Sequence, residues 1–483
     1  MVLGIALLAL GISPAAAPAL ASTRAASPAA TKTVTGTLKD GATYKIEVPG
    51  NWNGTLFLYS HGYVVPGSPN PATDVGDPVT GAWLLSHGYA LAGSSYATTG
   101  WAIQQALPDQ IHTLNVFDKT FGAPSHTIAW GHSLGGIITA GLIQTYPRRF
   151  SAALPMCGVL SGGVATWNTA LDSEVAFEQL IAAPAGHPVQ LVNITDPTTN
   201  LTTAETVATG AQQTAQGRAR LALVNALGDT PGWFTPLSPE PARNDFTTQE
   251  VNQFLWDTEV TFPFAFDLRA ELEGRAGGNV SWNTGVNYVR QLRKSVDRRE
   301  VVALYKAAGL NLRADLNTLN GSARISAKPK AVAYLVKNIT FNGRLPVPVL
   351  TMHTTGDGLV VNQNEQAYAS VVRRAGDSRL LRQIFVHRAG HCAFTPAETI
   401  TAARTLLRRM ATGHWNDRAL RPAHLNAAAA SLGPTANIFA AQGGTCPTGA
   451  PVDGVCSTPP AFLRFRPAPY LRPFDRLMFH LRF

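Results

Sequence analysis

One pentapeptide, Gly-His-Ser-Leu-Gly at positions 131–135, constrains the fold of this chain more than any other segment. An apolar run at 127–130 precedes it, and a helix-compatible segment at 134–146 follows it. A serine held on a sharp turn between a strand and a helix leaves no room for side chains two positions away, which explains the two glycines. We therefore expect Ser133 to stand exposed on such a turn, as a nucleophile does.

Short apolar runs of the same kind recur on both sides of this turn. They lie at 54–60, 89–94, 151–156, 347–351 and 382–386. Segments of helical periodicity, 82–86 and 104–120, lie between the first of them. Residues 33–48 alternate around Asp40 and Gly41 and predict a β-hairpin. Buried strands that alternate with helices predict an α/β fold, with a mostly parallel sheet flanked by helices.

The apolar runs are interrupted by a long segment, 160–343, that is helical and irregular. It carries an aromatic patch at 262–266 and the tryptophans Trp167, Trp233, Trp256 and Trp282. We interpret 160–343 as a mainly helical cap, inserted after the strand that follows the nucleophile helix, and expect it to shape a substrate pocket. The core then consists of 33–159 and 344–411. Residues 412–483, rich in Ala, Pro and Arg, form a C-terminal extension without clear periodicity.

The N-terminus has the pattern of an export signal. An apolar run at 2–10 is followed by small residues ending in Ala19-Leu20-Ala21, so residues 1–21 are predicted to be a signal peptide and 22–32 a linker. No Lys or Arg precedes the run, and the alternative is an uncleaved anchor. The run is far shorter than the roughly 20 apolar residues of a membrane span. We expect a secreted protein without a stable membrane span.

The composition of the chain limits the classes of partner and cofactor that we expect it to bind. The net charge of +9 comes mainly from scattered arginines, with no compact basic run, so nucleic acid is not an expected partner. A basic surface could favour anionic substrates or cell-envelope polymers, or it could simply be solvated. The chain contains neither a C-x-x-C nor an H-E-x-x-H motif and no phosphate-binding glycine loop. We therefore expect neither a metal nor a cofactor. The sequence indicates no particular oligomeric state.

A serine nucleophile needs a base, and the base needs a carboxylate that orients it. In this fold class the three residues follow one another along the chain as Ser, Asp and His. Asp357 ends the run 349–357, a strand that leaves into a turn, and His391 lies on a loop after the last strand. The alternative base, His387, belongs to the strand end, and His353 is interpreted as a packing histidine. We predict Asp357 as the acid and His391 as the base.

Two backbone N–H groups are expected to bind the oxyanion. The first belongs to Leu134, directly after the nucleophile, and the second to Tyr63, after His61 and Gly62. His61 is interpreted as a residue that shapes this loop, with a direct catalytic role as the alternative.

With these motifs, the chain resembles the α/β-hydrolase superfamily over roughly 50–160 and 345–410. The resemblance implies an acyl-enzyme mechanism in which Ser133 attacks, His391 transfers the proton and Asp357 orients the imidazolium. The large cap and the His-Cys pair at 391–392 are similar to those of secreted tannase and feruloyl-esterase-like enzymes. Those enzymes carry cysteine directly before the nucleophile, where this chain has His132.

Four cysteines in an exported protein predict two disulfides, and three pairings are possible. The fold that the resemblance implies favours Cys157–Cys392, which would brace the histidine loop, and Cys446–Cys456, which would close the C-terminal extension. A buried free thiol at Cys157 is the alternative.

The leading hypothesis is a secreted serine hydrolase that cleaves carboxylic esters, either small molecules or polymers. One alternative is a peptidase of the prolyl-oligopeptidase type, which shares the order of the three residues. Another is a non-catalytic protein that binds the cell envelope through the C-terminal segment at 461–483, which is rich in Arg and Pro.

Overall fold

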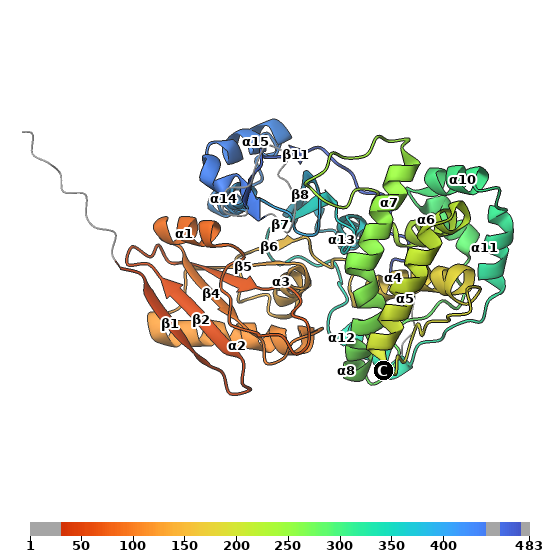
Figure 1. Ribbon diagram of the computed structural model, residues 1–483. Coiled ribbons are helices and arrows are strands. Elements are labelled where there is room, and N and C mark those ends of the chain that lie inside the picture. The colour runs from red at the N-terminus through yellow and green to blue at the C-terminus, as the bar shows by residue number, and fades with distance from the viewer. Residues whose placement is uncertain (1–29, 441–454, 475–483) are drawn as a thin grey trace, which may run out of the picture.

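The computed structural model describes residues 30–440 and 455–474 (Figure 1). The predicted signal peptide and nearly all of the linker lie outside these residues. A single large sheet holds nine strands of the described chain. In spatial order they are β1 (Lys32–Thr37), β2 (Thr43–Val48), β4 (Ala90–Ser94), β3 (Thr55–Ser60), β5 (His126–His132), β6 (Ala152–Met156), β7 (Val349–Gly356), β8 (Leu381–Ala389) and β11 (Phe462–Leu463).

The sheet is parallel from β4 to β8, and antiparallel pairing is confined to its two edges. β1 and β2 form the predicted hairpin, and the apolar runs of the sequence form the buried central strands. Helices of the βαβ connections cover both faces. With a serine turn between β5 and the helix that follows it, this architecture is the α/β-hydrolase fold, which confirms the predicted fold class.

Side chains alternate between the two faces of the sheet and build two apolar layers. Leu56 and Leu58 of β3 pack toward α2 (Ile103–Phe121) and α3 (Leu134–Thr145). Phe57 and Tyr59 of the same strand point the other way, toward α1 (Pro78–Ser86) and α14 (Pro396–Thr412). Because both faces are covered, the central strands are apolar throughout, which is why they stood out in the sequence.

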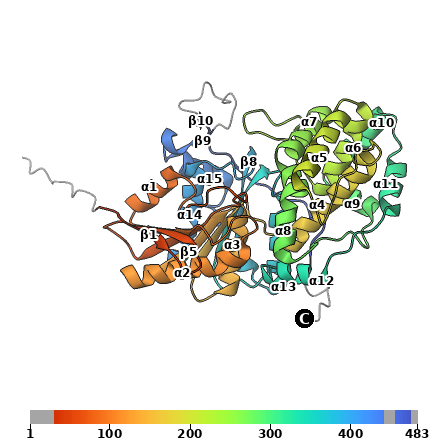
Figure 2. The ribbon, with the colours of Figure 1, turned by 60° about the horizontal axis from the view of Figure 1, so that its bottom comes forward.

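The segment 160–343, all of which the structure describes, contains helices and no strand, and it lies between β6 and β7. Figures 1 and 2 show these helices together on one side of the sheet. They include α4 (Gly163–Phe177), η1 (Glu178–Ala182), α5 (Pro197–Gln212), α6 (Ala215–Gly228), α7 (Phe246–Trp256), η2 (Asp257–Thr261), η3 (Pro263–Leu268), α8 (Arg269–Ala276), α9 (Tyr288–Lys294), α10 (Arg298–Ala307), α11 (Leu312–Gly321) and α12 (Pro329–Lys337). These helices bury a second apolar core of their own, around Phe177, Leu223 and Phe266.

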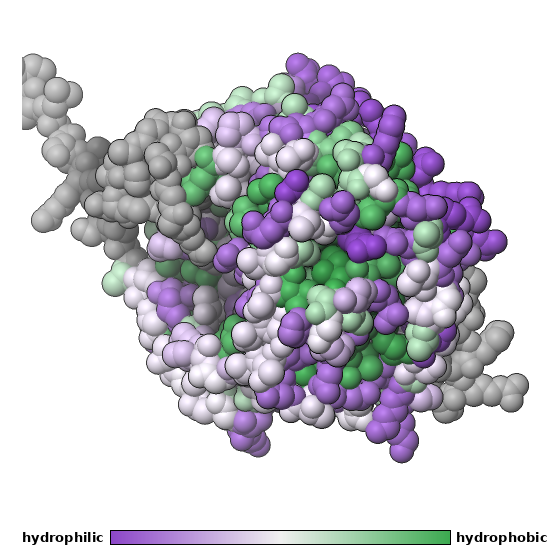
Figure 3. All heavy atoms as spheres, turned by 45° about the vertical axis from the view of Figure 1, so that its right-hand side comes forward, coloured by the Kyte–Doolittle hydropathy of each residue, from purple (hydrophilic) through white to green (hydrophobic). Residues whose placement is uncertain are grey.

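The outer face of this helical insertion is mixed in polarity. Figure 3 shows apolar side chains between charged and polar ones on this side of the molecule. The large apolar residues that are exposed here include Val251, Val296 and Val302. Apolar atoms make up more than half of an ordinary protein surface, so this face alone predicts no partner. Within the described residues, no helix combines the length and the apolar character of a membrane span.

The C-terminal extension is more regular than its sequence suggested. It contains α15 (Pro422–Ala430), and β11 adds an antiparallel strand to β8 at the edge of the sheet. The backbone N–H of Ala461 donates to Glu398 of α14, and Arg472 donates to Asp172 of α4 at 2.7 Å. The extension therefore ties the sheet to the helical insertion.

The buried ion pair between Arg388 and Glu398 carries a testable prediction. The guanidinium donates two hydrogen bonds, at 2.7 and 3.0 Å, and both side chains are at most 4% exposed. Glu398→Gln would leave a buried cation without its counter-charge, so we expect the free energy of unfolding in urea to fall by about 3–5 kcal/mol. In the exposed pair between Arg382 and Asp417, Asp417→Asn should cost less than about 1 kcal/mol. Equal losses in the two variants would contradict the prediction.

Candidate active site

Ser133 stands on a sharp turn between β5 and α3. Its backbone has φ 57° and ψ −122°, and its N–H donates to the carbonyl of Met156 at 3.0 Å. A Cβ at Gly131 or Gly135 would lie 2.3 or 1.9 Å from the carbonyl oxygen of Ser60. A side chain at either position would collide with the backbone of β3, so the two glycines are what allows the turn.

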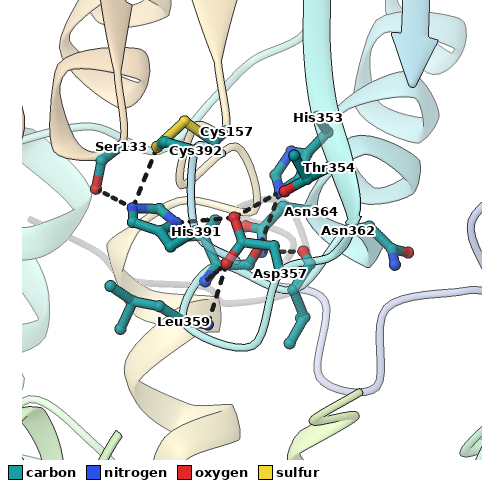
Figure 4. A network of polar contacts seen from close by, with 12 residues as sticks. Ser133, Cys157, His353, Thr354, Asp357, Leu359, Asn362, Asn364, His391 and Cys392 are labelled. Atoms are coloured by element: carbon teal, nitrogen blue, oxygen red, sulfur yellow. Dashed lines mark hydrogen bonds and ion pairs between the residues drawn. A yellow bond between two sulfur atoms is a disulfide. The ribbon is translucent and has the colours of Figure 1, made fainter. Parts of the chain in front are cut away.

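The three side chains expected to act together lie in one hydrogen-bonded chain (Figure 4). His391 Nε2 lies 2.8 Å from Ser133 Oγ, and His391 Nδ1 lies 2.8 Å from Asp357 Oδ2. Ser133 follows β5, Asp357 follows β7 and His391 follows β8. Because these strands are parallel, their carboxyl ends meet at one edge of the sheet, which places the three loops next to each other.

Asp357 is held as a buried carboxylate. Its Oδ1 accepts the N–H groups of Leu359 at 3.1 Å and Val360 at 2.9 Å. Burial alone would raise the pKa of this carboxyl group, but the neighbouring His391 and His353 outweigh it and lower the pKa to about 2. The side chain is thus ionised at neutral pH and can accept the Nδ1–H of His391.

His353 lies on β7, directly behind Asp357, and is wholly buried. Its Nε2 lies 2.7 Å from the carbonyl of Val360 and 3.5 Å from Asp357 Oδ2, and its Nδ1 lies 3.2 Å from Glu365 Oε1. Both ring nitrogens therefore face acceptors, which only the doubly protonated ring can satisfy. Burial disfavours this charge, but the contacts with Asp357 and Glu365 raise the pKa of His353 to about 10. The packing histidine expected from the sequence is a buried cation beside the acid.

The protonation of His353 should appear in the pH dependence of stability. An unfolded histidine loses its proton near pH 6.5, whereas the folded one keeps it to about pH 10. The stabilisation is therefore complete below pH 6.5 and is lost as the pH rises, by about 1.4 kcal/mol per unit. In urea unfolding between pH 7 and 9, His353→Gln should remove this slope. His387→Gln, at a side chain that is 43% exposed, should keep it, and equal slopes in both variants would contradict the assignment.

The other histidines singled out in the sequence are engaged elsewhere. His387 Nε2 pairs with Glu240 at 3.2 Å on the outer side of β8. His61 lies between the carbonyls of Gly62 at 2.8 Å and Ser95 at 3.1 Å, which supports a loop-shaping role. His132 lies next to the nucleophile, half-buried, with Nδ1 3.0 Å from the hydroxyl of Tyr59. Burial and the nearby His391 lower the pKa of His132 to about 4.

Two backbone N–H groups are free to face an oxyanion at Ser133. Leu134 is the first residue of α3, where a helix leaves its N–H groups without internal acceptors. The loop of Tyr63 packs against the serine, since a Cβ built on Gly62 would lie 3.4 Å from Ser133 Cβ. Within residues 30–440 and 455–474, neither N–H has a protein acceptor. Both residues line the pocket that contains Ser133.

A disulfide joins Cys157, at the end of β6, to Cys392, next to His391. Their Cα atoms lie 5.4 Å apart, so the loop that carries His391 is attached covalently to the sheet. The alternative of a free thiol at Cys157 is wrong. The predicted Cys446–Cys456 pair depends on Cys446, which lies outside the described residues.

Two groups of residues in the described part of the chain have metal-ligand chemistry. The first consists of Cys157, His391 and Cys392, but both sulfurs are in the disulfide and offer no thiolate. The second, Asp40, Asp109 and His112, lies at the β1–β2 turn and α2. It includes none of the residues that line the pocket at Ser133.

A pocket of about 150 Å³ opens at Ser133 and extends under the helical insertion. Its walls include seven aromatic residues: Tyr63, Trp101, Trp167, Phe177, Phe262, Phe264 and Tyr470. Trp167 and the 262–266 patch, expected in a cap, thus reach the nucleophile. Tyr470 was missed, because a lone tyrosine in a segment without periodicity gives no local signal. It comes from the C-terminal extension and is buried.

Two acidic side chains lie in the wall of this pocket that the insertion provides. Asp257, on the π-helical turn η2, accepts from Asn225 at 2.7 Å and Thr261 at 3.0 Å, while burial raises its pKa to about 7. Glu174 is paired with the buried Arg269 at 2.6 Å. The pocket is therefore apolar over most of its wall, with a few polar groups in fixed positions.

Comparison with known proteins finds a relative that aligns with most of the chain. No family model matches this chain. It is 28% identical over 445 residues to an o-phthalyl amidase from Xanthobacter agilis, covering 85% of this chain and 94% of that protein. The chain is thus similar to a hydrolase over most of its length.

Two esterases are among the solved structures whose folds partly resemble this one. Feruloyl esterase B from Aspergillus oryzae has 11% identity and a TM-score of 0.39, covering 80% of this chain and 82% of that chain. The rice cell wall degrading esterase LipA from Xanthomonas oryzae has 14% identity and a TM-score of 0.33, covering 78% and 88%. The fold assignment rests on the strand order and on the turn at Ser133.

Proposed function

We propose that this protein is a serine hydrolase that cleaves carboxylic esters, with Ser133 as nucleophile, His391 as general base and Asp357 as the acid that orients it. The observation that carries the proposal is the continuous chain of hydrogen bonds from Asp357 through His391 to Ser133, at 2.8 Å each, at the mouth of an apolar pocket. A serine hydroxyl is a weak nucleophile until a base accepts its proton, and this arrangement supplies that base.

In the proposed mechanism, Ser133 Oγ attacks the carbonyl carbon of the ester while its proton passes to His391 Nε2. Asp357 accepts the Nδ1–H of the imidazolium and stabilises its charge. The tetrahedral intermediate collapses, His391 protonates the leaving alcohol, and an acyl group remains on Ser133. Water, deprotonated by the same histidine, then releases the acid.

The negative oxygen of the tetrahedral intermediate is proposed to bind the N–H groups of Leu134 and Tyr63. Both are free of protein acceptors among the described residues and lie beside the nucleophile. The N-terminus of α3 adds the positive end of its dipole. Each such donor is worth roughly 3 kcal/mol of transition-state stabilisation.

The size and lining of the pocket favour a substrate with one small ring. A cavity of about 150 Å³ with an apolar wall is large enough for a benzene ring. The aromatic side chains that surround it suit edge-to-face packing with such a ring. We propose esters with a small aromatic acyl or alcohol group as the preferred class.

Amide hydrolysis is the second candidate. The relative that matches over 94% of its own length is named an amidase, and the same three residues can protonate an amine leaving group. Peptides are a less suitable class of amide, because an extended chain needs a longer groove than a pocket of about 150 Å³.

Secretion is proposed on separate grounds. The signal-like N-terminus predicts export, and the Cys157–Cys392 disulfide is typical of proteins that fold in an oxidising compartment. The alternative of a non-catalytic protein that binds the cell envelope does not explain why Ser133, His391 and Asp357 are hydrogen-bonded in one chain.

The proposed function is tested with matched substrates. We expect phenyl acetate, p-nitrophenyl acetate and methyl benzoate to be hydrolysed, with higher kcat/KM than p-nitrophenyl esters of long acyl chains, since these exceed the pocket. Benzanilide and acetanilide test the amide candidate. Turnover of the anilides without turnover of the esters would replace the ester proposal by the amide one. Turnover of neither, by protein that is folded by circular dichroism, would refute both.

A further inference from the structure

A groove between α14 and α15 gathers cationic side chains. They come from α14, from the connection that follows it and from α15: Arg404, Arg408, Arg409, Arg418 and His424. We call this the arginine groove. Its lining, all within the described chain, contains no aspartate or glutamate and shares no residue with the pocket at Ser133. Figures 1 and 2 show α14 and α15 on the sheet side of the molecule, apart from the helical insertion.

The guanidinium groups of the groove lack anionic partners. Among the residues that the structure describes, the side chains of Arg404, Arg408 and Arg418 make no hydrogen bond or ion pair. The Nε of Arg409 is buried and has no acceptor. The acid beside the groove, Asp417, is occupied by Arg382 at 2.9 Å. Arg404, Arg408 and Arg418 are exposed, and Arg409 is partly buried.

The like charges of these arginines lie close together around one surface groove, an arrangement that attracts anions. Arg404 and Arg408 are four residues apart on α14, so their like charges share one helix face and repel. Arg418 and His424 line the same groove. Arg409 is held over the ring of Trp415, 5.6 Å from its centroid, which fixes one guanidinium in place. The groove thus gathers several cationic donors around one cavity.

We propose that the arginine groove binds a ligand that carries two or more phosphate groups. A guanidinium is a planar fork that matches the oxygens of phosphate. Several guanidinium groups, on α14 and on the connection that follows it, offer more donors than one carboxylate can accept. The groove has a volume of about 440 Å³, within the range of small-molecule sites. The phosphates could belong to a soluble oligophosphate or to lipid headgroups, which share this chemistry.

The proposal is tested by titrating tripolyphosphate into the full-length protein at physiological ionic strength, with calorimetric detection. We expect saturable binding that weakens about tenfold or more in R404Q/R408Q, because two charge-assisted contacts are lost. The matched control is R290Q/R313Q, which removes two exposed arginines from α9 and α11 of the insertion. The control should bind like the wild type. Absence of saturable binding, or equal loss in both double variants, would overturn the proposal.

A second arm identifies the source of the phosphates. Vesicles of phosphatidylcholine containing phosphatidic acid are sedimented with each protein. If the wild type co-sediments with the vesicles and R404Q/R408Q does not, the ligand is a lipid headgroup. If the wild type binds tripolyphosphate but does not co-sediment, the ligand is a soluble oligophosphate. Hydrolysis of phenyl acetate by R404Q/R408Q should equal that of the wild type, because the groove and the pocket at Ser133 have no residue in common. The proposal therefore stands or falls independently of the hydrolase activity.

Discussion

Ser133→Ala should abolish turnover, lowering kcat for the best ester by about six orders of magnitude, the loss seen when a serine hydrolase is deprived of its nucleophile. The physical reason is that, within the described part of the chain, Ser133 Oγ is the only oxygen in a hydrogen bond with His391 Nε2, at 2.8 Å. Covalent labelling by a fluorophosphonate probe, followed by mass spectrometry, is the most direct measurement. The label should be found on the peptide that contains Ser133 and be absent from the variant.

The matched control for this experiment is Ser86→Ala, at an exposed serine that ends α1. It should keep both labelling and turnover. Labelling of the Ser133→Ala protein, with its circular dichroism unchanged, would show that another residue is the nucleophile. Failure of the folded wild type to react with the probe at all would remove the serine mechanism.

Asp357→Asn should lower kcat by about four orders of magnitude while leaving the fold intact. The carboxylate is buried, ionised and 2.8 Å from His391 Nδ1, so it selects the tautomer in which Nε2 can accept the serine proton. An amide of the same shape can donate to Nδ1 instead, which puts the proton on the wrong nitrogen. The measurement is kcat for phenyl acetate, with thermal unfolding as the check on folding.

The combined variant tests whether Asp357 acts through the same step as Ser133. Residues that act as a unit are not additive, so Ser133→Ala with Asp357→Asn should be no slower than Ser133→Ala alone. Asp417→Asn, at an exposed aspartate on the far side of β8, serves as the control and should keep full activity. A loss of less than about tenfold in Asp357→Asn would contradict the proposed role of the acid.

Features that local sequence can encode were predicted well. The central strands were visible because both faces of the sheet are covered, which makes them apolar without interruption. The turn at Ser133 could be recognised in the sequence because only glycine fits at positions 131 and 135, where any side chain would collide with the backbone of Ser60. Asp357 and His391 were identified because the fold puts its functional loops at strand ends.

Of the features that depend on distant contacts, the Cys157–Cys392 disulfide was predicted from the expected fold, but others were not. The role of His353 depends on Glu365, twelve residues later on α13 (Gln363–Ala375), and on the fold of the loop at Asp357. A lone histidine inside a strand carries no sign of its charge. Tyr470 enters the pocket because β11 pairs with β8 and carries the extension back toward the insertion, and a two-residue strand has no periodicity to detect.

The turn at Ser133, the alternation of strands with helices and the candidate acid and base at strand ends were thus determined by the sequence itself, because each is specified by residues that adjoin it in the chain. Tertiary structure alone decided how these parts meet. It placed Oγ, the imidazole and the carboxylate within hydrogen-bonding distance, charged His353 behind the acid, and closed the pocket with a tyrosine from the extension. The physical reason is that a pKa, a hydrogen bond or a pocket wall depends on neighbours in space, and those neighbours come from segments up to 300 residues apart.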